Sequence, residues 1–197
     1  RKHASLAMWC GNNEIYEGLR YWGWDKKYND PSIMKGMFEG YDKLFHQLLP
    51  AKVKELDPDR FYMHGSPYEA NWGRPESWKI ADSHNWGVWY GRKPFESFDN
   101  EVGRFMSEYG FQAFPEMKTI STFATEKDYQ IESDVMNDHQ KATIGNELID
   151  KTMRLYYNVP TKFEDFVYVG QVLQGKGMRR GFEAHRRNMP YCMGTLY

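Results

Sequence analysis

Two glutamates follow apolar runs of the kind that form buried strands. Glu14 ends "LAMWCGNNE", and Glu108 lies in "EVGRFMSEYG"; an aromatic segment that contains glycine follows each one. Most surface glutamates lie instead on helices or in charged loops. Paired carboxylates across a cleft are what glycoside hydrolysis requires, because one protonates the leaving oxygen while the other attacks the sugar carbon or activates water. The two residues therefore predict a glycosidase active site.

The separation of the two glutamates agrees with this chemistry. They lie about 94 residues apart, and a (β/α)8 barrel uses about 250 residues for eight strand–helix units, or roughly 31 per unit. The separation corresponds to three units, and two further candidate strands lie between the glutamates. Strand ends three positions apart face each other across the mouth of a closed barrel. Both carboxylates would then reach one small substrate.

The elements that position these residues follow from hydrophobic patterning. Short apolar and aromatic runs predict strands at residues 6–10, 61–67, 85–91, 101–110 and 192–197. Apolar residues at helical spacing predict helices over 31–49 and 133–157. A further long helix is expected over about 162–187 from the signal at its start. Residues 16–30 and 68–84 are expected to be long loops. Such an order favours βα units, a parallel sheet, and chemistry at the carboxyl ends of the strands.

Two helix starts carry recognisable signals. Asp30 followed by Pro31 is typical of an N-cap with proline at the first helical position. Thr161 and Glu164 have the spacing of a capping box.

Several motifs in combination resemble glycoside hydrolase family 2, closest to its β-mannosidases. They are "WCGNNE" with the Trp-rich loop behind it, "RFMSEYGFQAFPEM", the "HQK…GN" stretch and the terminal "GTLY". The resemblance covers nearly the entire chain. It implies an α/β fold, the (β/α)8 TIM barrel, of which only the part from about strand 4 to the start of strand 8 is present. Residues 1–197 would then be a partial catalytic domain of a larger multidomain chain.

The resemblance also implies roles for the two glutamates. Glu14 corresponds to the general acid/base and Glu108 to the nucleophile of an enzyme that retains the anomeric configuration and uses no cofactor. Retention calls for carboxyl groups about 5–5.5 Å apart, against roughly 6.5–9.5 Å for inversion. Glu14 must be protonated when it meets the substrate, whereas Glu108 must be ionised. Glu14 can then act as base towards water once the glycosyl-enzyme has formed.

Two polar residues near the glutamates are candidate substrate-binding residues. Asn13 resembles the family asparagine that hydrogen-bonds the 2-hydroxyl of the sugar, although a turn asparagine is an alternative. His84, in "ADSHNW", resembles a recurrent histidine of β-mannosidase-like sequences that would touch the substrate; a loop histidine without a catalytic task is the alternative.

Aromatic residues supply two more candidates. Tyr90, at the end of the third predicted strand, could donate a hydrogen bond to Glu108, or could be a plain core or rim tyrosine. Trp22 and Trp24 follow the acid, where an indole face could pack on a pyranose ring, and we favour Trp22.

Composition excludes several other classes. The chain has 26 basic and 27 acidic residues and a net charge of −1, so it shows no footprint for nucleic acid or for an anionic membrane surface. No apolar run approaches the length of a bilayer span. The six histidines are scattered and form no HxxxH or HExxH motif, so we expect no metal site.

The sequence thus predicts a retaining exo-β-mannosidase that removes terminal β-D-mannose from an oligosaccharide or glycoside. Alternatives are another family 2 enzyme (β-galactosidase, β-glucuronidase or exo-β-glucosaminidase), a catalytically inactive sugar-binding relative, or a barrel that serves only as an interaction scaffold. The resemblance implies a periplasmic, secreted or lysosomal protein. Because the chain begins and ends near expected strands, its partner would be the rest of its own barrel or another copy, and we expect the segment by itself to be inactive.

Overall fold

The computed structural model describes residues 3–197. The chain divides into two compact units, each with its own core. Unit 1 contains the residues up to His84 together with Gly103–Ser107, and unit 2 contains Asn85–Val102 together with Glu108–Tyr197.

A parallel strand pair opens unit 1. Strand β1 (Met8–Cys10) pairs with β2 (Phe61–Met63), with Trp9 opposite Tyr62. The parallel pairing continues past the strand ends as a bridge between Asn13 and Ser66. Parallel neighbours require a long crossover connection, which the helices between them supply. The strand expected at 6–10 is confirmed over Met8–Cys10, and the strand expected at 61–67 is confirmed over Phe61–Met63 only.

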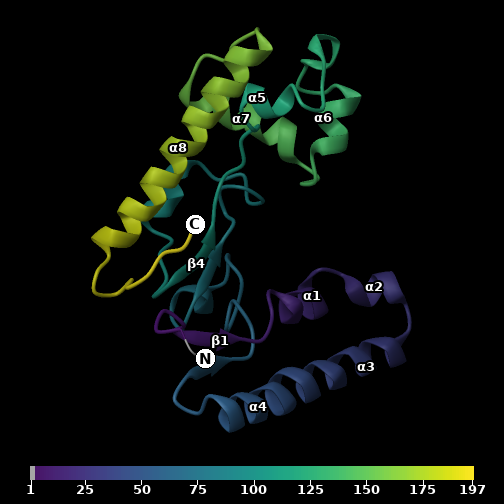
Figure 1. Ribbon diagram of the computed structural model, residues 1–197, viewed down its shortest axis with the longest axis vertical. Helices are drawn as coiled ribbons and strands as arrows, with labels where there is room; N and C mark the ends of the chain where they lie inside the picture. The colour runs from purple at the N-terminus through teal and green to yellow at the C-terminus, as the bar shows by residue number, and fades with distance from the viewer. Residues whose placement is uncertain (1–2) are drawn as a thin grey trace. The chain divides into compact units, whose positions relative to one another are not determined.

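Helices fill the connection between β1 and β2. They are α1 (Ile15–Tyr21), α2 (Trp24–Tyr28), α3 (Pro31–Tyr41), the π-helix η1 (Asp42–Leu48) and α4 (Leu49–Leu56). The last three follow one another as one long helical segment (Figure 1). The Asp30 side chain accepts a hydrogen bond from the Ser32 backbone N–H at 2.8 Å, so the predicted N-cap is confirmed and the helix runs on to Leu56.

The expectation of a loop over residues 16–30 is wrong. Leu19 of α1 is buried in the core of unit 1 together with Tyr41 and Phe45, and Trp24 of α2 packs against the same cluster. Burial of these apolar side chains stabilises two short helices. The glycine and aromatic residues of this segment favoured a loop in the sequence.

A second strand pair consists of β3 (Ser83–Asn85) and β4 (Met106–Tyr109). The strand expected at 101–110 is therefore confirmed in its second half. The strand expected at 85–91 is wrong beyond Asn85, because the following residues form a turn in which Trp89 and Gly91 donate backbone hydrogen bonds to the Trp86 carbonyl. Val88 and Trp89 are buried within that turn, and apolar residues of these types are also typical of a buried strand.

Unit 2 is mainly helical. Its helices are η3 (Phe95–Asp99), α5 (Met117–Ile120), η4 (Glu126–Asp128), α6 (Asp134–His139), α7 (Gly145–Tyr156) and α8 (Phe163–Arg187), and unit 1 contributes one more short 3-10 helix, η2 (Pro75–Trp78). Helix α8, green to yellow in Figure 1, packs against η3 and α7. The helix expected over 162–187 is confirmed.

Three smaller expectations in unit 2 are wrong. The helix expected over 133–157 is interrupted between α6 and α7, where the Gln140 side chain accepts a hydrogen bond from the Ala142 N–H and donates one to Asn146. Helix α8 has Lys162 as its N-cap without a side-chain hydrogen bond, so no capping box forms there. Within the described residues, 192–197 form no strand.

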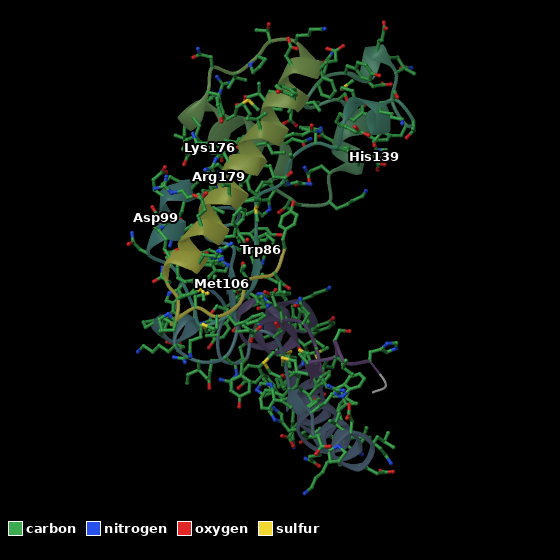
Figure 2. All side chains as sticks on the ribbon, turned by 60° about the vertical axis from the view of Figure 1, so that its left-hand side comes forward. Trp86, Asp99, Met106, His139, Lys176 and Arg179 are labelled. Atoms are coloured by element: carbon green, nitrogen blue, oxygen red, sulfur yellow. The ribbon has the colours of Figure 1, made fainter. Side chains whose placement is uncertain are left out.

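Ion pairs join α8 to η3. Arg180 binds Asp99 at 2.5 Å and Glu96 at 2.9 Å, and Arg187 binds Asp99 at 3.0 Å. Asp99 lies beside the helix that also carries Lys176 and Arg179 (Figure 2). These guanidinium groups, Arg180 first, hold the pKa of the Asp99 carboxyl below its usual value.

The described strands form two two-stranded sheets. The mixed helix and strand architecture is confirmed, whereas the partial (β/α)8 barrel stays a prediction. No helix within residues 3–197 combines the length and the apolar character needed to cross a membrane.

Candidate active site

Glu14 lies four residues after the end of β1, at the N-cap position of α1. Its backbone N–H donates to the Ser66 carbonyl at 2.8 Å, and the Ser66 N–H donates to the Asn12 carbonyl at 2.9 Å. Glu14 has φ = 54°, in the left-handed region that a residue with a Cβ seldom occupies. Such strained positions cluster at functional sites, because the surrounding structure must hold them.

Asn12 stabilises this turn. Its side-chain amide donates to the His64 carbonyl at 2.7 Å, and its side-chain oxygen accepts from the Ile15 N–H at 3.1 Å. The Asn12 side chain thus connects the residue after β2 with the first residue of α1, next to Glu14.

The Glu14 carboxylate has two hydrogen-bond partners from distant parts of unit 1. Its Oε1 lies 2.5 Å from His84 Nδ1 and accepts from Asn71 Nδ2 at 2.8 Å. The His84 side chain is fully buried, and the Glu14 side chain is only 12% exposed. A buried histidine and an amide therefore hold the carboxylate in one orientation.

A chain of hydrogen bonds continues behind His84. Its Nε2 lies 2.8 Å from Ser66 Oγ, and Ser66 Oγ donates to Asp82 Oδ2 at 2.5 Å. Asp82 also accepts from Ser107 Oγ at 2.6 Å and from the Tyr68 N–H at 2.9 Å. Carboxylates and histidine are also ligand types for metal ions, and Glu14 and His84 each offer such an atom.

The loop that carries Asn71 is tied to α1. Glu17 is buried and accepts hydrogen bonds from the Asn71 N–H at 3.2 Å and from Arg74 Nη2. The Arg74 guanidinium lies over the Tyr21 ring, 4.2 Å from its centroid. These contacts fix Asn71 against the helix that Glu14 begins.

His64 and Tyr41, which lie beside Asn12, have shifted pKa values. Burial, with a smaller contribution from the nearby His46, lowers the pKa of His64. Burial raises the pKa of the Tyr41 hydroxyl, which lies 3.1 Å from His64 Nδ1. Both shifts favour the neutral forms of these two groups.

Glu108 belongs to unit 2 and is the third residue of β4. Its Oε2 accepts a hydrogen bond from the Trp86 indole Nε1–H at 3.0 Å. Tyr90, predicted at the end of a strand and as a donor to Glu108, lies instead in a turn, and 53% of it is exposed. Its ring meets the Trp86 ring edge-on at 6.2 Å.

The remaining predicted residues lie at exposed positions of unit 1. Asn13 follows β1, is exposed, and pairs through its backbone with Ser66. Trp22 caps the C-terminal end of α1, is 53% exposed, and meets Trp24 edge-on at 6.1 Å. An exposed indole is available to a ligand, but the substrate contacts of both residues stay predictions.

His84 is brought to Glu14, which differs from the expectation of a loop histidine. It lies on β3 and is fully buried. Three further residues of the site did not stand out in the sequence: Ser66 and Asp82 behind His84, and Asn71, which donates to Glu14. Asp82 directly precedes β3 and lies two residues before His84, and this spacing, which puts two side chains on one face of extended chain, was the signal that could have linked those two.

The chain is similar to β-mannosidases over its whole length. It is 32% identical to β-mannosidase B of Neosartorya fischeri and 34% identical to β-mannosidase B of Aspergillus clavatus, in both cases over 100% of this chain and 24% of the relative. The structure resembles the crystal structure of a β-D-mannosidase from Dictyoglomus thermophilum with a TM-score of 0.83 and 31% identity, over 98% of this chain and 23% of that one. No family model matches the chain.

The chain therefore spans about a quarter of the length of the relatives that it matches. The resemblance that the glutamate motifs indicated is confirmed: this chain is similar from end to end to a segment of β-mannosidases.

Proposed function

We propose that a polypeptide containing this chain is an exo-acting β-mannosidase that removes terminal β-D-mannose without a cofactor. The observation that carries the proposal is the similarity of the whole chain to β-mannosidases, in sequence and in structure. By the same resemblance, the chain contributes the part of a TIM barrel from about strand 4 to the start of strand 8. The resemblance further suggests a periplasmic, secreted or lysosomal setting.

Glu14 is proposed as the general acid and base. In the first step it protonates the glycosidic oxygen while Glu108 attacks the anomeric carbon, so the carbon–oxygen bond to the leaving group breaks and a glycosyl–Glu108 ester forms. In the second step Glu14 takes a proton from water, the water oxygen bonds to the anomeric carbon, and Glu108 leaves as a carboxylate. Support comes from the fixed orientation of the Glu14 carboxylate between His84 and Asn71.

Glu108 is proposed as the nucleophile. The hydrogen bond from the Trp86 indole to Oε2 orients the Glu108 carboxylate, which supports this role. Trp86 thereby supplies the kind of donor that the sequence assigned to Tyr90.

The other candidates are proposed in the substrate cleft. Asn13 would bind the 2-hydroxyl of the mannose, Trp22 would pack on a sugar face, and Tyr90 would line the rim. His84 is proposed to act through Glu14, because its buried ring contacts that carboxylate.

A panel of 4-nitrophenyl β-glycosides tests the sugar specificity on a polypeptide of the full length of the relatives. We expect the β-mannoside to have the highest kcat/KM among the mannoside, galactoside, glucuronide and N-acetylglucosaminide. A poor β-mannoside and a good substrate among the other three would contradict the assignment and favour another family 2 activity.

The Glu108→Ala variant of the same polypeptide separates an enzyme from a sugar-binding relative. We expect turnover to fall by roughly 10⁴-fold or more, because the covalent step is lost, while mannose or a mannoside still raises the melting temperature. A wild-type protein that shows the thermal shift without turnover would be a binding relative. Absence of both turnover and shift would favour an interaction scaffold.

A further inference from the structure

We propose that Ser66 and Asp82 are positioning residues that fix the tautomer of His84, so that one proton is held between His84 and Glu14. This inference rests on the proposed acid/base role of Glu14. It concerns the hydrogen-bonded chain Asp82–Ser66–His84–Glu14, all of whose members lie in unit 1.

Asp82 sets the direction in which protons are donated along this chain of hydrogen bonds. It is buried, and it accepts from the Tyr68 N–H on Oδ1 and from the hydroxyls of Ser66 and Ser107 on Oδ2. An ionised carboxylate has acceptors only, so every group that binds it must donate. The single hydroxyl proton of Ser66 is therefore committed to Asp82.

Ser66 in turn determines which ring nitrogen of His84 carries the hydrogen. With its proton directed at Asp82, the Ser66 oxygen can only accept at the 2.8 Å contact with His84 Nε2, so Nε2 must carry a hydrogen. The direct separation of His84 Nε2 from Asp82 Oδ2 is 3.8 Å, beyond hydrogen-bond distance. Ser66 is thus the link that the carboxylate needs to orient the ring.

The tautomer of His84 decides what it offers to Glu14. A neutral imidazole has one N–H, and when it lies on Nε2 the other nitrogen presents a lone pair. That nitrogen, Nδ1, lies 2.5 Å from Glu14 Oε1, so this contact requires one proton between the two atoms. The Glu14 oxygen can hold it as a carboxylic acid and still accept from Asn71 Nδ2.

This arrangement suits both steps of the proposed reaction. In the first step the shared proton goes to the leaving oxygen. The Nδ1 lone pair then faces an ionised Glu14, an unfavourable contact that favours return of a proton from water in the second step. Without the Ser66 hydroxyl, the ring could carry its hydrogen on Nδ1 instead, donate it to ionised Glu14, and weaken Glu14 as an acid.

The first test measures acid catalysis separately from folding. In a polypeptide of the relatives' length, kcat/KM is compared for 2,4-dinitrophenyl β-mannoside, whose leaving group needs no proton, and for phenyl β-mannoside, whose leaving group does. We expect Ser66→Ala to lower kcat/KM about tenfold to hundredfold more for the phenyl glycoside, because general acid catalysis is the step lost. Ser66→Thr, which keeps a hydroxyl, should restore most of the difference.

Ser83→Ala is the matched control. Ser83 is buried, and its hydroxyl donates to the Ser77 carbonyl at 2.5 Å and takes no part in the hydrogen-bonded chain. Its loss should change kcat/KM for the two mannosides by the same factor. If Ser66→Ala also lowers kcat/KM equally for the two mannosides, or lowers it for neither, Ser66 has no role in proton placement and the inference is overturned.

The second test does not depend on activity. Nitrogen-15 NMR of histidine-labelled protein, with the His84 signals assigned by their absence in His84→Gln, reports which ring nitrogen carries hydrogen. We expect hydrogen on Nε2 in the wild type and a shift towards Nδ1 in Ser66→Ala; hydrogen on Nδ1 in the wild type would overturn the inference. If the wild type hydrolyses no β-mannoside, the proposed function fails, while this measurement still decides the tautomer.

Discussion

His185, on α8 in unit 2, is a buried histidine with a role in stability. The residue is only 1% exposed, its Nδ1 lies 2.9 Å from Thr195 Oγ1, and its ring meets Tyr109 edge-on at 4.7 Å. Burial lowers the pKa of His185 to about 4, because the charged ring would lose its hydration.

The low pKa of His185 predicts a loss of stability in mild acid. The unfolded chain takes up a proton near pH 6.5, whereas the folded chain does so only near pH 4. The stabilisation is therefore complete above pH 6.5 and falls by about 3 kcal/mol as the pH drops towards 4. Urea unfolding at several pH values should show a smaller loss in His185→Gln than in the wild type; parallel curves over this interval would contradict the assignment.

At the residue scale, the sequence identified the groups that carry chemistry but not the groups that orient them. Glu14 and Glu108 stand out because a carboxylate after an apolar strand is unusual. Ser66, Asn71 and Asp82 do not stand out, because serine, asparagine and aspartate are ordinary turn residues whose partners are set by tertiary contacts. His84 was noticed, but its burial could not be read from a short polar motif.

Helix α8 approaches its neighbours closely through glycine. A Cβ built on Gly177 would lie 2.6 Å from Phe95 Cε1, closer than van der Waals contact allows. Phe95 is 1% exposed and stacks on Tyr156 at 4.9 Å, so its ring has little room to move. A Cβ built on Gly175, two residues earlier on the same helix, would have nothing within 4 Å.

This pair of glycines gives opposite expectations for the same substitution. Gly175→Ala should stabilise α8 by about 0.5–1 kcal/mol, because alanine loses less backbone entropy in a helix. Gly177→Ala should destabilise unit 2 by about 1–3 kcal/mol, because overpacking against Phe95 outweighs that gain. Amide hydrogen exchange across α8 measures both, and a stabilising Gly177→Ala would show that the helix and η3 separate more easily than the packing indicates.

At the element scale, long periodic helices were predictable and short elements were not. The spacing of apolar residues located α3, because an apolar face repeats over several turns. Helix α8 was located from the Thr161 and Glu164 pattern, although no capping box forms there. Helices α1 and α2 have five to seven residues, too few for a period, and owe their helical form to burial against α3. The turn after Asn85 was mistaken for a strand because Val88 and Trp89 are buried without being extended.

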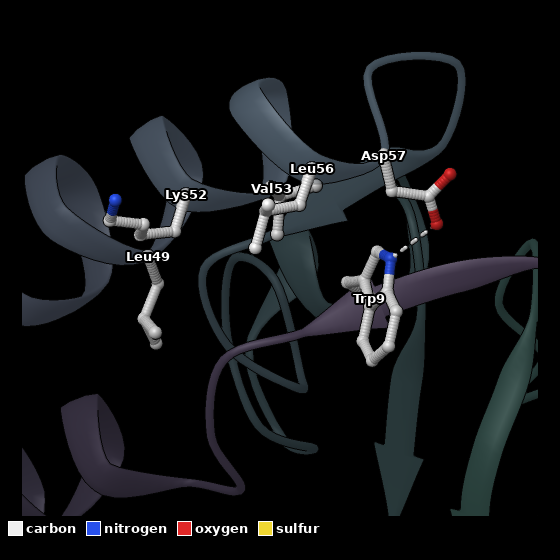
Figure 3. A pocket seen from close by; sticks show the side chains of 6 residues that line it. All are labelled: Trp9, Leu49, Lys52, Val53, Leu56 and Asp57. Carbon is white, nitrogen blue, oxygen red and sulfur yellow. Dashed lines mark hydrogen bonds between the residues drawn. The ribbon is translucent and has the colours of Figure 1, made fainter.

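At the scale of the whole molecule, β1 exposes apolar surface. Met8 and Trp9 are 36% and 37% exposed, and β1 has one strand partner within the described residues. Beside β1, the Trp9 indole donates to Asp57 Oδ2 at 3.0 Å and, with Leu49, Val53 and Leu56 of α4, lines a pocket of about 340 Å³ (Figure 3). An open strand edge next to an apolar pocket is a surface that a further strand and helix would cover.

This exposed surface predicts how the 197 residues behave alone. Since the chain matches only 24% of the length of its relatives, we expect the isolated polypeptide to bind an apolar dye such as ANS, to self-associate, and to hydrolyse no nitrophenyl β-mannoside, whereas the longer polypeptide is active. Leu56→Lys, at a position of α4 that is 53% exposed beside Trp9, should reduce dye binding and self-association of the isolated chain without giving activity, because a charge interrupts the exposed apolar surface. Light scattering measures self-association, ANS fluorescence measures dye binding, and a nitrophenyl β-mannoside assay measures activity. An active, monodisperse 197-residue monomer would mean that β1 and the Trp9 pocket need no covering, and that Glu14 reaches its working geometry without the rest of a barrel.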